Sequence, residues 1–185
     1  MKNKRLTYYL IIFLSVLSQV IYAQEYTESE LKAAYLYNFT KFVEWPSHHD
    51  HAPSGVFEID VFRNKKIATV LREMVKGKKV KNRNIKVVYI EQIDQINTSC
   101  QMLLIDNVNN DELLTILKKT KEHPILTVGN KLNLFCQQGG VLNFTSREAS
   151  YRFEINKHVA DWNGLKINMK LLLLSKIITT NDAEF

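Results

Sequence analysis

The feature that most constrains the fold is the regular alternation of strand-type and helix-type segments between residues 55 and 138. Strand-type segments alternate apolar and polar residues or are short apolar runs, whereas helix-type segments repeat apolar residues every three to four positions. The alternation predicts strands at Gly55–Arg63, Asn84–Glu91, Gln101–Asp106 and Pro124–Gly129. It predicts helices at Lys65–Val75, Asp111–Lys121 and Lys131–Gln138, the last closed by Gly139 and Gly140. Strands separated by helices pair in parallel, with the helices on both faces of the sheet.

Two further regions complete the expected architecture. Residues 27–30 have the form of a capping box and begin a helix that Pro46 ends. Val141–Thr145 and Tyr151–Asn156 have the pattern of a β-hairpin, and two helical segments follow and end near Ile178. A hairpin adds antiparallel pairing to a parallel sheet. We therefore predict a Rossmann-like α/β fold with a mixed, mostly parallel sheet, helices on both faces and a late β-hairpin.

Residues 1–23 have the three parts of a secretory signal peptide. Three basic residues begin the chain, Tyr8–Leu17 is an apolar run, and Ile21 and Ala23 stand at the −3 and −1 positions of a cleavage site. The alternative is an uncleaved membrane anchor, which the shortness of the run disfavours. We expect cleavage after Ala23, export, and a single domain over residues 24–185.

The net charge depends on this leader. The chain has 25 Lys and Arg against 19 Asp and Glu, and three basic residues but no acidic ones lie in residues 1–23. The remainder has 22 basic and 19 acidic residues, a net charge of +3. The most basic stretch, Lys76–Lys86, has no interleaved aromatic residue and has the character of a solvated turn leading into a strand. We expect no nucleic-acid partner.

Two cysteines, Cys100 and Cys136, are the only ones in the chain. An oxidising compartment permits a disulfide between them. If the helix expected at Lys131–Gln138 runs back toward the beginnings of the parallel strands, it carries Cys136 close to Cys100. The alternative is two buried free thiols, which are common in protein cores.

The sequence lacks the catalytic motifs that would indicate an enzyme: it has no G-x-S-x-G, no H-E-x-x-H and no phosphate-binding G-x-x-x-x-G-K. His48, His49, Asp50 and His51 form one cluster of potential metal ligands. The cluster has no second ligand pair at a defined spacing, so a solvated loop is the favoured interpretation. We expect neither catalysis nor a bound metal or cofactor.

Polar residues of the hairpin are the first candidates for a binding site. Arg152, Glu154 and Asn156 share one face of their strand, and Asn143 lies on the adjoining strand. An arginine can hold an anionic ligand while a carboxylate or an amide orients it. The alternative is a cross-strand polar ladder exposed to water.

The end of the first helix gives the second set of candidates. Tyr37, Lys41, Glu44 and Trp45 place polar groups among aromatic ones, and aromatic residues are frequent anchors of protein interfaces. The alternative is a core helix whose last turn is fixed by Trp45, with Lys41 and Glu44 as an ordinary surface pair.

Both terminal helical segments carry more apolar residues than one sheet face can cover. They either pack on each other as well as on the sheet, or leave an apolar surface for self-association or for a partner.

Several of these segments, taken together and in order, resemble the YfiR family of exported proteins. The segments are SELKAAYLYNFTKFVEWP (29–46), ILTVGN (125–130), QGGVLNF (138–144), YRFEIN (151–156) and GLKINMKLLLLSKII (164–178). The resemblance covers residues 28 to 178, and Asn143, Phe153, Glu154 and Asn156 match its recurring motif. It implies a small periplasmic α/β domain that associates as a homodimer.

The resemblance also implies a regulator and not an enzyme. Family members repress a membrane-bound diguanylate cyclase by binding its periplasmic sensor domain, which keeps cyclic-di-GMP output and biofilm formation low. Sequestration at an outer-membrane lipoprotein releases the repressor. We therefore expect a periplasmic, non-catalytic signalling regulator that binds a membrane signalling protein. The alternative is a periplasmic small-molecule-binding sensor that uses the polar face of the hairpin.

Overall fold

A computed structural model describes residues 26–46, 55–146 and 152–179 of the chain. The predicted signal peptide at 1–23 and the cluster of His48, His49, Asp50 and His51 lie outside the described residues. Within the described ranges, no helix combines the length and the apolar character that a membrane span requires.

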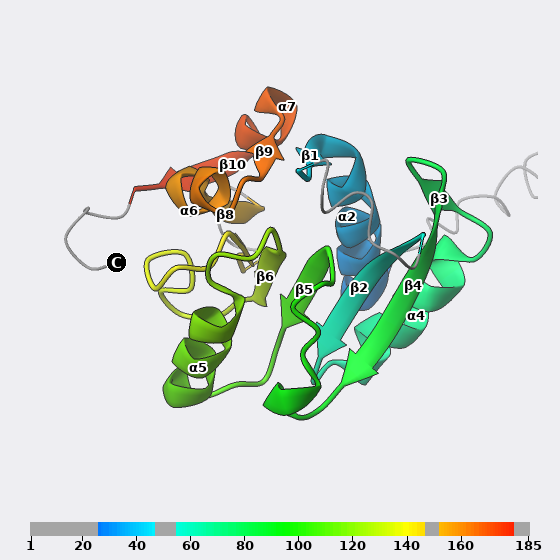
Figure 1. Cartoon of the computed structure of the whole chain (residues 1–185), viewed down its shortest axis with the longest axis horizontal. Helices are drawn as coiled ribbons and strands as arrows, with labels where there is room; N and C mark the ends of the chain where they lie inside the picture. The colour runs from blue at the N-terminus through cyan, green and yellow to red at the C-terminus, as the bar shows by residue number, and fades with distance from the viewer. Residues whose placement is uncertain (1–25, 47–54, 147–151, 180–185) are drawn as a thin grey trace, which may run out of the picture.

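The described chain forms an eight-stranded sheet with the order β10-β8-β7-β6-β5-β2-β4-β3 (Figure 1). Strands β2, β4, β5, β6 and β7 pair in parallel, β7 pairs antiparallel with β8, and β8 pairs in parallel with β10. The strands are β2 (Val56–Phe62), β3 (Lys79–Val80), β4 (Arg83–Ile90), β5 (Met102–Ile105), β6 (Leu126–Asn130), β7 (Leu142–Phe144), β8 (Phe153–Asn156) and β10 (Ser175–Ile178). A separate pair joins β1 (Val43–Glu44) to β9 (Lys166–Ile167). The predicted mixed, mostly parallel sheet with a late hairpin is confirmed.

Helices cover both faces of this sheet, as the alternation of apolar side chains requires. Phe57, Ile59 and Val61 of β2 pack with α2 and α4, whereas Phe62 of the same strand packs with α5. In Figure 1 the two layers lie on opposite sides of the strands. The helices are α2 (Glu28–Phe42), α4 (Lys65–Val75), α5 (Asn110–Thr120), α6 (Lys157–Trp162) and α7 (Met169–Leu172), with a 3-10 turn η1 (Ile93–Gln95).

Side-chain caps fix the starts of the long helices where the sequence indicates them. Thr27 and Glu30 form the predicted capping box at α2, and Asn109 and Glu112 form another at α5. At α4 the side chain of Asn64 accepts a hydrogen bond from the N–H of Ile67. Each such cap is worth about 1 kcal/mol, because it satisfies backbone donors that the helix leaves unpaired.

The helix predicted at Lys131–Gln138 is wrong. The segment between β6 and β7 is a series of turns, with Lys131 and Leu134 at positive φ values of 60° and 51°. Phe135 is the reason: its ring lies against the backbones of Gly129 and Gly140, and a Cβ on Gly140 would meet it at 2.1 Å. This contact holds the segment flat on the sheet, which a regular helix would not permit. We call residues 131–140 the turn crossover.

The prediction for the end of the chain is also wrong. Only four residues form α7, and Ser175–Ile178 form the edge strand β10 instead of a helix. Ile177 and Ile178 are β-branched, and such residues favour strands. The leucines that precede them continue the helical pattern, so the sequence does not show where the helix ends and the strand begins.

The basic stretch at Lys76–Lys86 contains a hairpin that its composition did not indicate. Lys81 and Asn82 have positive φ values of 46° and 66°, and they join β3 to β4 in antiparallel pairing. Two consecutive residues of this conformation make the tight turn that suits a twisted hairpin.

Candidate functional site

The polar residues of the hairpin do not surround a ligand pocket; two of them hold the turn crossover in place. Asn143 accepts a hydrogen bond from the N–H of Leu132 at 3.1 Å and donates to the carbonyl of Leu132 at 2.8 Å. Asn156 donates to the carbonyl of Cys136 at 2.8 Å and accepts from the N–H of Val159 at 3.0 Å, which caps α6. Both asparagines are buried.

Glu154 and Arg152 have different surroundings. Glu154 is paired across the sheet with Asn143 and lies 3.8 Å from the ammonium of Lys176 on β10. Arg152 is exposed and borders a hollow of only about 40 Å³, together with Lys32 and Lys131. The four hairpin candidates are thus divided between structural support and the surface.

Asn156→Ala is expected to lower the free energy of unfolding by about 2 kcal/mol. The change removes a helix cap and leaves the buried Cys136 carbonyl without its amide donor. Urea denaturation measures this loss. Asn168→Ala is the matched control, because Asn168 also caps a helix through the N–H of Lys170 but is exposed. Equal losses for the two variants would contradict the role assigned to Asn156.

The second candidate set is divided in the same way. Trp45 is only 5% exposed, donates its indole N–H to the carbonyl of Gln101 at 2.9 Å and packs edge-on against Phe57. Tyr37 lies near the surface between the ammonium groups of Lys41 and Lys78, which are 4.4 and 4.6 Å from its ring centre. Glu44 is exposed on β1. Trp45 therefore belongs to the core, Tyr37 is half-buried against that core, and Lys41 and Glu44 are exposed.

Cys100 and Cys136 are free thiols in the structure, and both are buried. Without the expected helix, Cys136 stays beside the beginning of β7, where its sulfur lies 3.8 Å from the carbonyl of Val141. Cys100 directly precedes β5, two strands away. The structure thus has the alternative arrangement, two buried cysteines with no disulfide between them.

The usual ligand position of an α/β sheet is filled by side chains. Ligands of such folds bind beyond the carboxyl ends of the strands, where the order of the strands reverses, here between β2 and β5. There the carboxylate of Asp106 accepts hydrogen bonds from Asn64 at 2.5 Å and from Asn130 at 2.7 Å. Lys32 donates to Asn130 and pairs with Glu28. Lys131 and Lys32 hold the pKa of the Glu28 carboxyl down, to about 2.

A buried carboxyl stands out in the middle of β2. Asp60 is 1% exposed, and its neighbours include the N–H of Asn97 and the thiol of Cys100. Burial, and next the negative charge of Glu58, raise the pKa of Asp60 to about 7. The sequence signal is a second acid, two positions after Glu58 and on the same face, within the otherwise apolar strand GVFEIDVFR.

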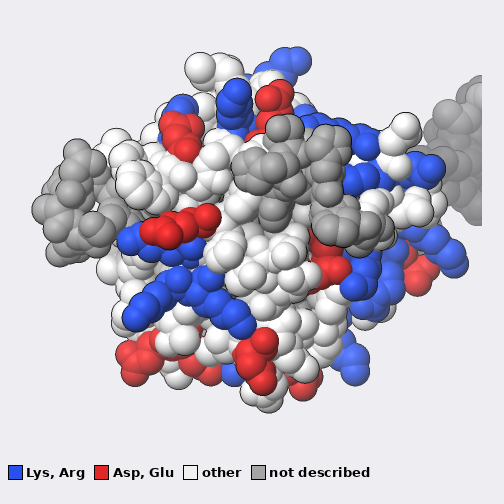
Figure 2. Space-filling view, viewed as in Figure 1, with Lys and Arg blue, Asp and Glu red and all other residues white. Residues whose placement is uncertain are grey.

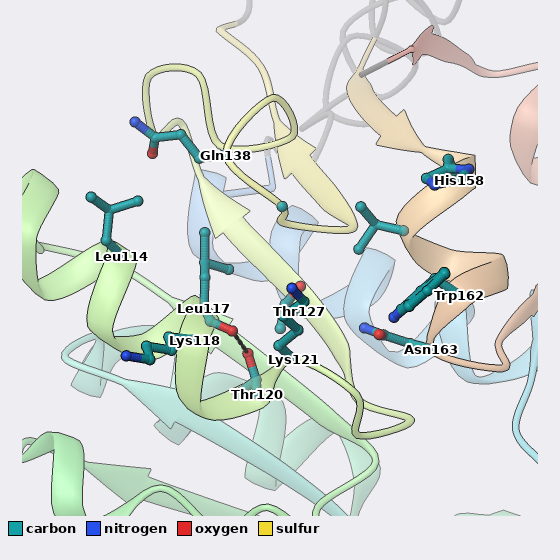
Figure 3. Close-up of a pocket in the computed structure, with 12 residues that line it drawn as sticks. Leu114, Leu117, Lys118, Thr120, Lys121, Thr127, Gln138, His158, Trp162 and Asn163 are labelled. Carbon is teal, nitrogen blue, oxygen red and sulfur yellow. Dashed lines mark hydrogen bonds between the residues drawn. The ribbon is translucent and has the colours of Figure 1, made fainter. Parts of the chain in front are cut away.

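A cavity with a volume of about 530 Å³ lies between α5 and α6 (Figure 3). Leu114, Leu117 and Lys118 of α5 line one side, and Trp162 and His158 of α6 line the other. Sequence reasoning missed this cavity because it depends on the absence of the expected helix in the turn crossover.

An apolar edge lies at the end of the chain. Exposed apolar side chains lie on α7, on the outermost strand β10 and on the two residues between them, and we call this surface the α7–β10 edge: Met169 (66% exposed), Leu173 (77%), Leu174 (62%) and Ile177 (51%). The apolar excess noted in the sequence is thus in part a surface feature. Exposed large apolar side chains that gather in one place indicate an interaction site.

Charges do not single out another surface on the face seen in Figure 2. Lys and Arg side chains are interspersed with Asp and Glu over the coloured part of this face. Within the described ranges, no group of three or more His, Cys, Asp or Glu residues is placed to hold a metal ion.

The comparisons with known proteins agree with the resemblance in the sequence. Residues 29–176 match the family described as YfiR/HmsC-like. No curated protein matches the chain at a significant level.

Proposed function

Because the chain belongs to the YfiR/HmsC-like family, we propose that it is a periplasmic, non-catalytic regulator of a membrane diguanylate cyclase. It binds the extracytoplasmic part of that enzyme and shifts the equilibrium between its active and inactive states. The family match over residues 29–176 is the observation that carries this proposal. Sequestration by an outer-membrane lipoprotein would relieve the repression.

The α7–β10 edge is the surface that we assign to the partner. The outer side of β10 has no neighbouring strand in the described sheet, so its backbone groups can pair with a strand of another protein. Leu173 and Ile177 supply apolar contacts beside that backbone. The homodimer expected for the family is the competing use of this edge.

The double variant Leu173→Lys, Ile177→Lys is expected to reduce capture of the cyclase at least tenfold, because two charges are placed in an apolar interface. Capture is measured by crosslinking the protein in membranes of its own host and quantifying the bound cyclase by mass spectrometry. Leu114→Lys is the matched control: Leu114 is 45% exposed but lies on α5, away from this edge.

Each outcome of this test has a separate meaning. Failure of the unchanged, folded protein to capture any membrane cyclase would contradict the proposed function. Normal capture by the double variant would contradict the assignment of the α7–β10 edge. If the double variant becomes monomeric while capture remains normal, the edge is a dimer interface and the partner binds elsewhere.

A small-molecule sensor is the second candidate function, and the cavity between α5 and α6 favours it. The polar face of the hairpin does not, because Asn143 and Asn156 are occupied by backbone groups.

A further inference from the structure

The cavity between α5 and α6 exists because the link from β6 to β7 is not a helix. In a parallel α/β sheet a helix ordinarily covers such a link. Here the turn crossover lies flat on the strands, and Gln138 and Gly139 at its end form one wall of the cavity. Its volume of about 530 Å³ falls in the range of small-molecule sites.

Apolar side chains line much of the cavity, together with the buried Thr120 and Thr127. Leu114 and Leu117 face it from α5, and Trp162 faces it from α6 (Figure 3). Val159 of α6 also lines it. Val159 and Leu117 are buried, whereas Trp162 is 66% exposed and stands at the rim. A flat or branched apolar body could displace water from these side chains, which is the main source of affinity in such sites.

The charged side chains that line the cavity are basic. Lys118 and Lys121 carry ammonium groups at the α5 side, and His158 lies at the α6 side. None of the residues that line the cavity is Asp or Glu. This charge favours an anionic ligand over a neutral or cationic one.

One polar atom of the lining lacks a hydrogen-bond partner. The Oε1 atom of Gln138 is buried and accepts no hydrogen bond from the described residues. The Nε2 atom of the same side chain donates to Asn110 at 2.8 Å, which fixes the orientation of the amide. A buried acceptor without a donor is unfavourable, so a ligand N–H or O–H that reaches Oε1 gains affinity.

We propose that this cavity binds a small organic anion, an aryl or branched alkyl carboxylate or sulfonate that also carries an N–H or O–H donor. The apolar body lies between Leu117, Val159 and Trp162, and the acid group lies at the rim beside Lys118 and Lys121. The residues that line this site are not those of the α7–β10 edge.

Two fluorescent probes test the site with the purified protein. Anilinonaphthalene sulfonate is an aryl sulfonate with one N–H, and N-phenyl-1-naphthylamine is its neutral counterpart without the sulfonate. The anionic probe is expected to bind with one-to-one saturation, at least tenfold more tightly than the neutral one. Equal affinities, or binding that does not saturate, would overturn the anion site.

Variants of residues that line the cavity test where the probe binds. Lys118→Gln with Lys121→Gln is expected to weaken the anionic probe about tenfold and to leave the neutral probe almost unchanged. Leu114→Trp, which fills the mouth of the cavity from an exposed position, is expected to weaken both. Circular dichroism verifies that these surface variants fold.

The control variant is Lys65→Gln with Lys66→Gln, which removes two exposed lysines from α4 on the other face of the sheet. It is expected to bind both probes as the unchanged protein does. Unchanged binding in Leu114→Trp, or equal weakening in the α4 control, would overturn the proposed location. The probe assays do not contain the cyclase, so their results are independent of the partner-capture test.

Discussion

Asp60→Asn is expected to stabilise the folded protein by about 4 kcal/mol at pH 8 and to change its stability little at pH 4. Asp60 is buried, and its pKa is raised to about 7. The unfolded chain releases this proton near pH 4, whereas the folded chain holds it until about pH 7. The favourable contribution of the protonated carboxyl is therefore complete below pH 4 and is lost as the pH rises through 7. A difference of about three pKa units corresponds to about 4 kcal/mol.

Urea denaturation at pH 4, 6 and 8 measures this effect as the difference between the variant and the unchanged protein. Carboxyls with lowered pKa values, such as Glu28 and Glu112, make the folded protein more stable as the pH rises. Their contributions are the same in the variant and in the unchanged protein, so they cancel when the two are compared. Asp94→Asn is the control, since Asp94 is an exposed carboxyl in η1. A constant difference between Asp60→Asn and the unchanged protein over this range would refute the assignment.

Trp45→Ala is expected to lower the free energy of unfolding by about 3–5 kcal/mol, the usual cost of deleting a large buried aromatic side chain. The variant loses the edge-on contact with Phe57, whose ring centre is 5.0 Å away, and the hydrogen bond to the carbonyl of Gln101. Trp45→Phe keeps an aromatic ring and is expected to lose about half as much.

The second tryptophan supplies the comparison for this variant. Trp162 is 66% exposed, so Trp162→Ala is expected to change stability by less than about 1 kcal/mol. Denaturant unfolding followed by circular dichroism compares the two. A loss in Trp45→Ala no greater than that in Trp162→Ala would show that Trp45 does not support the core.

The parallel part of the fold could be predicted from the sequence because its signals are local. The strand Val56–Phe62 and the helix Lys65–Val75 lie within one residue of their predicted bounds, since apolar periodicity and the cap at Asn64 act over a few residues. The turn crossover could not be predicted, because a contact between Phe135 and two glycines decides it. The strand β10 forms because the open side of β8 offers it hydrogen bonds, which no local pattern records.

The candidate residues show the same limit. A polar side chain on a strand has the same pattern whether it meets a ligand, water or another part of the backbone. Asn143 and Asn156 were predicted as possible ligand contacts, and both bind backbone of the turn crossover. Trp45 has the composition of an interface anchor but is covered by the core. Lys118, Lys121 and Gln138 come together only in the folded chain.

The turn crossover also has a consequence for the order in which the protein folds. A helix can begin to form from local hydrogen bonds alone, but residues 131–140 are held by Asn143 and Asn156 as well as by Phe135, and both asparagines follow them in the chain. The crossover therefore settles only after the hairpin of β7 and β8 has formed. The wall of the cavity between α5 and α6 is among the last parts of the molecule to be built, and during synthesis it waits for almost the whole chain to be made.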